Sequence, residues 1–164
     1  MKKLVVGSLL FCASVAHAED VYIEGTVESR CMITTDTPGV YGNPTPYELS
    51  TAPADGGVVP IVRYDVITGD YYKAVISHPD SFSSSPTLDD ITTWTGEVSV
   101  EEVSDTAMSD YETNKVEYSN VTEFELTTAG TTWFSVDSSV EYGAQTSLPA
   151  GDYVAIVEAE CVAL

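Results

Sequence analysis

The feature that most constrains this chain is the spacing of its apolar residues, which alternate with polar residues over short runs. No segment after residue 18 has the period of an amphipathic helix. The runs are rich in Val, Ile, Thr, Tyr, Phe and Trp, and clusters of Gly, Pro, Ser and Asp separate them. Because side chains on a β-strand point alternately to two faces, a period of two indicates half-buried strands. The sequence therefore predicts an all-β protein, an antiparallel β-sandwich without a second domain.

The turn clusters divide the chain into about eight to ten expected strands. A Thr-Gly-Asp turn at residues 68–70 predicts a hairpin between two of them. Residues 36–57 are rich in Pro and Gly, residues 78–90 read as a loop, and residues 105–114 favour a short helical turn. The expected strands cover residues 21–35, 47–49, 58–67, 71–77, 91–103, 115–118, 121–128, 133–136, 140–142 and 153–164.

The charge of the chain excludes two classes of partner. It has 26 Asp and Glu residues against 6 Lys and Arg residues, a formal net charge of −20. Such a surface repels phosphate backbones and anionic lipid headgroups, so nucleic acids and membrane surfaces are not expected partners. The apolar fraction of 43% is enough for a core, which distinguishes the chain from a disordered acidic tail.

Residues 1–18 have the pattern of a secretory signal peptide. Lys2 and Lys3 form a positive start, residues 4–15 are apolar, and Ala16-His17-Ala18 places small residues at a cleavage site. The apolar run is too short to cross a bilayer, so no membrane span is expected. We expect export, with residues 19–164 as the mature chain.

Two cysteines follow the expected signal peptide, Cys31 and Cys161. In an oxidising compartment an isolated pair of cysteines forms a disulfide, so these two are predicted to be bonded. Neither has a histidine near it in the sequence, and no CxxC motif is present. A metal site or a redox site built on them is therefore not expected.

Little in the sequence points to catalysis. His78 is the one histidine after residue 18, and no nucleophile elbow accompanies it. The acidic pairs at residues 89–90 and 101–102 lie outside any calcium-loop motif and are expected by chance among so many acids. No Gly-rich phosphate loop is present. We expect neither an enzyme nor a bound cofactor or metal.

The two ends of the mature chain carry the most informative pattern. Val21, Ile23, Gly25 and Val27 share one face of the first expected strand, which continues without a turn to Cys31. Near the other end, Pro-Ala-Gly-Asp-Tyr-Val-Ala-Ile-Val at residues 149–157 forms a turn and the start of the last expected strand. Together these segments resemble subunits of chaperone–usher pili, particularly those of the archaic and alternative branches.

The resemblance implies an immunoglobulin-like sandwich that lacks one strand and is completed by the N-terminal segment of the next subunit. Residues 19–30 would then be the donor segment, with Val21, Ile23, Gly25 and Val27 inserting, and residues 31–164 would be the body. A Cys31–Cys161 bond would lie near one end of the groove. The implied partners are other copies of the chain or related pilins, a periplasmic chaperone and an outer-membrane usher. The implied location is a fimbrium at the cell surface, with a role in cell adhesion.

The same residues fit a second interpretation. The chain would be a self-contained secreted or periplasmic β-sandwich, with a ligand-binding module as one form of it. Residues 21–27 would then be its own edge strand. The oligomeric state separates the two interpretations, because an unfilled groove exposes apolar surface and unpaired backbone groups.

Overall fold

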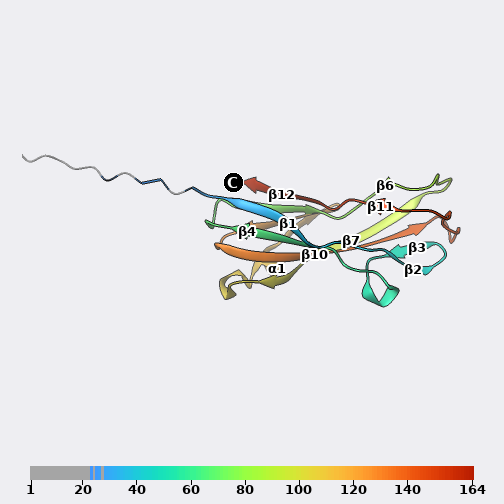
Figure 1. Ribbon diagram of the computed structural model, residues 1–164, viewed down its shortest axis with the longest axis horizontal. Coiled ribbons are helices and arrows are strands. Elements are labelled where there is room, and N and C mark those ends of the chain that lie inside the picture. Colours follow the sequence, from blue (N-terminus) through green and yellow to red (C-terminus); the bar gives the residue numbers. More distant parts are fainter. Residues whose placement is uncertain (1–22, 24, 27) are drawn as a thin grey trace, which may run out of the picture.

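The computed structural model describes Ile23, residues 25–26 and residues 28–164. Strands make up 52% of it and helices 7%, which confirms the predicted all-β, antiparallel, sandwich-like fold (Figure 1). The strands are β1 (Cys31–Thr37), β2 (Gly42–Thr45), β3 (Glu48–Ser50), β4 (Ile61–Val66), β5 (Tyr72–Ser77), β6 (Phe82–Ser84), β7 (Thr92–Val103), β8 (Val116–Tyr118), β9 (Val121–Leu126), β10 (Gly130–Tyr142), β11 (Val154–Ala155) and β12 (Glu158–Ala163). The short helices are η1 (Pro53–Asp55), η2 (Thr106–Met108) and α1 (Tyr111–Asn114).

The strands form two main sheets and a small third one. The larger sheet has the order β1-β4-β10-β3-β2, and β7 pairs with the opposite edge of β10. The second sheet has the order β12-β5-β9-β8, while β11 and β6 form a two-stranded ribbon. All of these pairings are antiparallel.

The core lies between the two main sheets and follows directly from the alternation in the sequence. Strand β4 buries Val62, Tyr64 and Val66 and leaves the residues between them half-buried. The same period holds along β9 and along most of β10. The completely buried side chains from both sheets pack together with Met108 and Tyr111 from the helical segment. The apolar face of each strand therefore covers that of the opposite sheet.

Several details of the predicted strands are wrong, and the expected loop at residues 78–90 contains β6. Residues 68–70 do not close a hairpin, because β4 belongs to the larger sheet and β5 to the second sheet, so this turn crosses between sheets. The expected strands at 133–136 and 140–142 are one continuous strand, β10. The last expected strand divides into β11, which pairs with β6, and β12, which pairs with β5.

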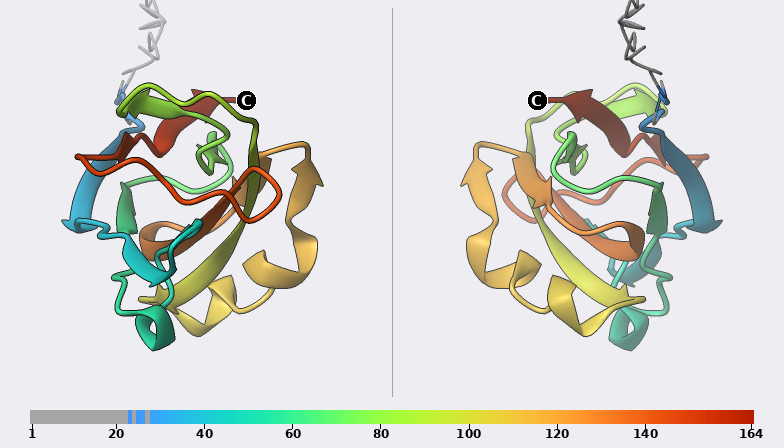
Figure 2. Two further views of the ribbon diagram at one scale, coloured as in Figure 1. Left: turned by 90° about the vertical axis from the view of Figure 1, so that its right-hand side faces the viewer. Right: turned by 90° about the vertical axis from the view of Figure 1, so that its left-hand side faces the viewer.

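The predicted helical turn at residues 105–114 is confirmed. It contains η2 and α1, and the carboxylate of Asp105 accepts a hydrogen bond of 2.8 Å from the Ala107 amide at the start of η2. The turn lies beside β8, on the side of the sandwich opposite β1 (Figure 2).

The edges of the two sheets meet along two seams. On one side the edge strand β1 lies beside the edge strand β12 of the second sheet, and we call this the β1/β12 seam (Figures 1 and 2). On the other side Lys115 connects the edge strands β7 and β8 through ion pairs with Glu97 and Glu117, and we call this the β7/β8 seam. Each of these four edge strands has one strand partner among the described residues, as do β2, β6 and β11 elsewhere.

Candidate functional site

A groove of about 870 Å³ begins at the β1/β12 seam and continues between β1 and residues 151–157; we call it the β1/β12 groove. One wall comes from Ile33 and Thr35 of β1, and the other from residues 151–157 and Ala159. The floor is made by residues 38–41, Leu49, Thr51, residues 60–62 and Ser138. Several of the apolar side chains that line it are exposed: Ile33 (37%), Val40 (54%), Val154 (48%) and Ile156 (59%).

Strand edges with unused hydrogen-bonding groups lie along β1 on one wall and at Ala159 of β12 on the other, where the remaining residues, 151–157, include β11, which pairs with β6. Strand β1 pairs with β4, and β12 pairs with β5. Among the described residues, neither strand pairs with another on its groove side. An extended segment lying in the groove could therefore hydrogen-bond with a wall through its main chain and place alternate side chains on the floor.

A disulfide closes one end of the groove. Cys31 and Cys161 are bonded with their Cα atoms 6.4 Å apart, within the usual range for a disulfide, as the sequence predicts. The groove begins two residues further along β1, at Ile33, and two residues earlier along β12, at Ala159. The bond therefore fixes the separation of the two walls at their starting point. A disulfide is also compatible with an oxidising environment such as the one reached by export.

The floor is held by polar contacts below its apolar surface. The Tyr41 hydroxyl and the Ser138 hydroxyl are 3.0 Å apart, and burial raises the pKa of Tyr41 above its ordinary value although this hydrogen bond opposes the shift. Thr51 donates from its side chain to the Ser138 carbonyl at 3.2 Å and accepts from the Ser138 amide at 2.9 Å. These bonds tie the segment before η1 to β10, so the floor is preformed.

The predicted donor residues are only partly within the described structure. Ile23 is 96% exposed, and Gly25 has no atom near the position of an added Cβ. Val21 and Val27 lie outside the described residues. The described residues from Ile23 to Arg30 belong to no strand and lead away from the sandwich (Figure 1). Within one copy, the described donor residues Ile23 and Gly25 do not line the groove.

Sequence reasoning identified the two walls but missed the floor. The pattern that ends in Cys31 and Ile33 marks β1, and the turn at residues 149–153 marks the other wall. Residues 38–41 and 49–51 were assigned mainly to a Pro- and Gly-rich connection. The signal that could have found them is the group of apolar residues, Val40, Tyr41 and Leu49, inside that connection.

The other candidate residues lie elsewhere. His78 is half-buried and does not line the groove, and its ring Nδ1 lies 3.2 Å from the Pro79 carbonyl. In the described residues, no three His, Cys, Asp or Glu side chains come together as a metal site, and no helix is long and apolar enough to span a membrane.

Comparison with known proteins adds no relative: no family model, no curated protein and no solved structure matches the chain.

Proposed function

We propose that this protein is a structural subunit of an extracellular pilus that assembles by β-strand complementation. Residues 19–29 of one copy would fill the β1/β12 groove of the next. The observation that carries this proposal is an apolar groove with the unpaired edge of β1 along one wall, while the described residues between Ile23 and Arg30 belong to no strand of their own sandwich. A sheet edge that accepts an extended peptide is an established mode of recognition.

The contacts at the start of β1 favour a segment from another copy over the chain's own segment. The Arg30 carbonyl accepts a hydrogen bond of 3.0 Å from the Ile67 amide, and the Ser29 hydroxyl lies 3.0 Å from the Tyr72 hydroxyl. The Cys31–Cys161 bond follows immediately. A chain held at these points would have to reverse direction at the closed end of the groove before it could enter its own groove.

The dimensions of the segment match those of the groove wall. Residues 21–27 span seven residues, as β1 does, which corresponds to about 23 Å of extended chain. With Val21, Ile23 and Val27 facing the floor, Tyr22, Glu24 and Glu28 face solvent. Burial of each large apolar side chain contributes roughly 1.5–3 kcal/mol.

The acidic surface predicts how such an assembly responds to salt. Copies with a net charge of −20 repel one another, and this repulsion is screened within a Debye length of about 8 Å at physiological ionic strength. Polymers should therefore form more readily in saline than in dilute buffer.

The test compares two faces of the donor segment. Ile23→Asp and Val27→Asp should each abolish polymers seen by electron microscopy and sedimentation, because an unpaired charge would be buried in the groove. Glu24→Ser on the opposite face is the matched control and should polymerise normally. If the unmodified chain stays monomeric in saline and deletion of residues 19–29 unfolds it, the segment belongs to its own sandwich and the proposal fails.

The volume of the groove also fits a second function, the binding of a small apolar ligand. A hollow of about 870 Å³ lined mainly by apolar side chains is within the size range of small-molecule sites. A binding module would be a stable monomer and would bind an apolar ligand without its N-terminal segment. The same sedimentation experiment separates it from a pilus subunit.

A further inference from the structure

The β7/β8 seam differs from the β1/β12 seam in what fills it. Strand β7 has 12 residues and pairs with β10 along its length. An open strand edge of that length would expose many N–H and C=O groups to pairing with another chain. The hollow beside its middle is only about 240 Å³, and Glu97 and Glu117 line it from the two sides of the seam.

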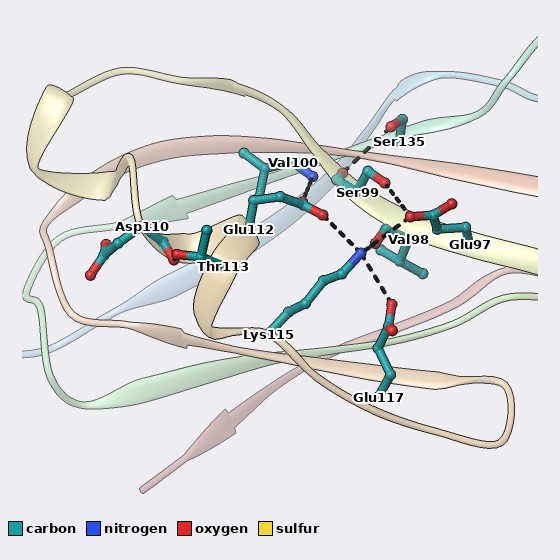
Figure 3. Close-up of polar contacts among 10 residues, drawn as sticks. All are labelled: Glu97, Val98, Ser99, Val100, Asp110, Glu112, Thr113, Lys115, Glu117 and Ser135. Atoms are coloured by element: carbon teal, nitrogen blue, oxygen red, sulfur yellow. Dashed lines mark hydrogen bonds and ion pairs between the residues drawn. The ribbon is translucent and has the colours of Figure 1, made fainter.

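Two side chains occupy hydrogen-bonding positions on the outer edge of β7. The Val100 amide donates to the Glu112 carboxylate at 2.7 Å, and Lys115 Nζ donates to the Val98 carbonyl at 3.0 Å (Figure 3). Residue Val136, opposite Val98, directs its own amide toward Pro60, away from β7. The Val98 carbonyl and the Val100 amide therefore point outward, where a neighbouring strand would otherwise bind them.

Lys115 holds this arrangement together from a partly enclosed position. Its side chain is 13% exposed, and Nζ lies 2.8 Å from Glu112, 3.1 Å from Glu117 on β8 and 3.4 Å from Glu97 on β7. Burial lowers the pKa of Lys115, but hydrogen bonds to Glu112 and Glu117 and their charges outweigh it, so its pKa is above the ordinary value. The ammonium group thus joins β7, α1 and β8.

We propose that Glu112 and Lys115 cap the edge of β7 and so prevent the strand of a second copy from pairing there. The cap lies near the middle of β7, so it interrupts the edge where an added strand would need continuous bonds. The helical turn of α1 is what places Glu112 and Lys115, three residues apart, on neighbouring bonds of one edge. Strand addition at β7 is then blocked, whereas the edges of β1 and β12 carry no such cap among the described residues. The cap itself does not depend on the proposed pilus function.

The main test removes the cap without changing the net charge. The full chain carrying Glu112→Ala and Lys115→Ala should self-associate at a protein concentration at least tenfold lower than the parent chain, as measured by sedimentation velocity in low salt. The matched control is Lys73→Ala with Glu123→Ala, which removes an ion pair of 2.8 Å between the paired strands β5 and β9 and uncovers no edge. The control should associate as the parent chain does.

Two further measurements distinguish a cap from a purely structural contact. The Val100 amide of the parent chain should exchange with solvent deuterium at least tenfold more slowly than the Gly96 amide, which lies on the same edge of β7. Glu112→Gln keeps an acceptor for that amide, so it should associate less than Glu112→Ala. The proposal is wrong if the Val100 and Gly96 amides exchange at the same rate, or if Glu112→Gln and Glu112→Ala self-associate to the same extent. It is also wrong if the variant with Glu112→Ala and Lys115→Ala associates as the Lys73→Ala, Glu123→Ala control does. If the double variant does not fold, the exchange rates and the two single variants decide.

Discussion

The Tyr64 hydroxyl donates a hydrogen bond of 3.1 Å to the main-chain oxygen of Glu160, so a side chain of β4 in one sheet holds β12 in the other. Tyr64 is completely buried, and its ring meets the Phe134 ring edge-on with centroids 5.4 Å apart. Burial raises the pKa of Tyr64 above its ordinary value, and the negative charge of Glu160 adds to the shift. The bond lies next to Cys161, so the closed end of the groove is fixed both by the disulfide and from within the core.

Loss of this hydroxyl should weaken the hold on β12. We expect Tyr64→Phe to lower the free energy of unfolding by about 1–3 kcal/mol, because the Glu160 carbonyl loses a buried partner while the ring remains. Urea denaturation followed by tyrosine and tryptophan fluorescence measures this. Tyr118→Phe is the control, since the Tyr118 hydroxyl contacts Glu123 at the surface and its loss should change stability little. Equal effects of the two substitutions would contradict the role given to Tyr64.

The disulfide should contribute more to the free energy of unfolding than the Tyr64 hydroxyl does. It joins residues 130 positions apart, and replacement of both Cys31 and Cys161 by Ala should cost roughly 2–5 kcal/mol of unfolding free energy. The mass of non-reduced protein should lie two hydrogens below that of the reduced protein. Labelling of both thiols in native, non-reduced protein would show that the bond does not form.

The sequence predicts those parts of this fold that depend on local alternation. Strands β4, β5 and β9 were predicted because each has one apolar face over a core, and the Cys31–Cys161 bond because these are the only two cysteines after the expected signal peptide. The pairing of strands could not be read in this way. A three-residue turn at 68–70 suits a hairpin and a crossover between sheets equally well, and only packing selects between them.

The candidate site was predictable only in part, for the same reason. Ile33 and residues 151–157 belong to patterned segments, so the sequence indicated both walls of the groove. The floor depends on contacts such as that between Tyr41 and Ser138, 97 residues apart, which no local pattern encodes. The cap on β7 was missed because a helix of four residues gives no periodic signal.

Neutralising one member of a like-charge pair in the larger sheet should increase the stability of the protein. Asp137 on β10 lies directly opposite Glu97 on β7, and burial raises the pKa of Asp137, with the charges of Glu97 and Glu101 adding to it. Like charges at opposed positions destabilise a sheet, so Asp137→Asn should stabilise the protein at pH 7 by roughly 0.2–1 kcal/mol after solvent screening. Glu102→Gln, opposite Trp133, is the matched control and should stabilise less.

The pH dependence of the Asp137 effect has a definite sign. A carboxyl group whose folded-state pKa is raised binds its proton more tightly in the folded protein. Its penalty is therefore complete at neutral pH and is relieved as the pH falls through the raised pKa toward the ordinary value of 3.8. The stabilising effect of Asp137→Asn should shrink over that range in urea denaturation curves. An effect that grows on acidification would contradict this assignment.

The contribution of Glu123 to stability should depend on pH in the opposite direction to that of Asp137. Hydrogen bonds from Lys73 and Tyr118 lower the pKa of Glu123 below its ordinary value of 4.5. Its contribution is then present above pH 4.5 and is lost as the pH falls through the lowered pKa. Glu123→Gln should remove that acid-dependent part of the stability curve, as measured by thermal unfolding between neutral and acidic pH. If Glu123→Gln leaves the loss of stability at acidic pH unchanged, the hydrogen bonds from Lys73 and Tyr118 to Glu123 are not maintained in solution.

The central claim is that the β1/β12 groove receives residues 19–29 of another copy, and peptide binding tests it most directly. A synthetic peptide of residues 19–29 is titrated calorimetrically into the chain that lacks those residues, with two substitutions on β1 as a matched pair. The substitutions are Ile33→Asp and Met32→Asp. The Ile33 side chain lines the groove, whereas the adjacent Met32 side chain is exposed outside it. The account predicts one peptide bound per chain, at least tenfold weaker binding with Ile33→Asp and unchanged binding with Met32→Asp. A folded chain that does not bind the peptide, or binds it equally with both substitutions, would contradict it.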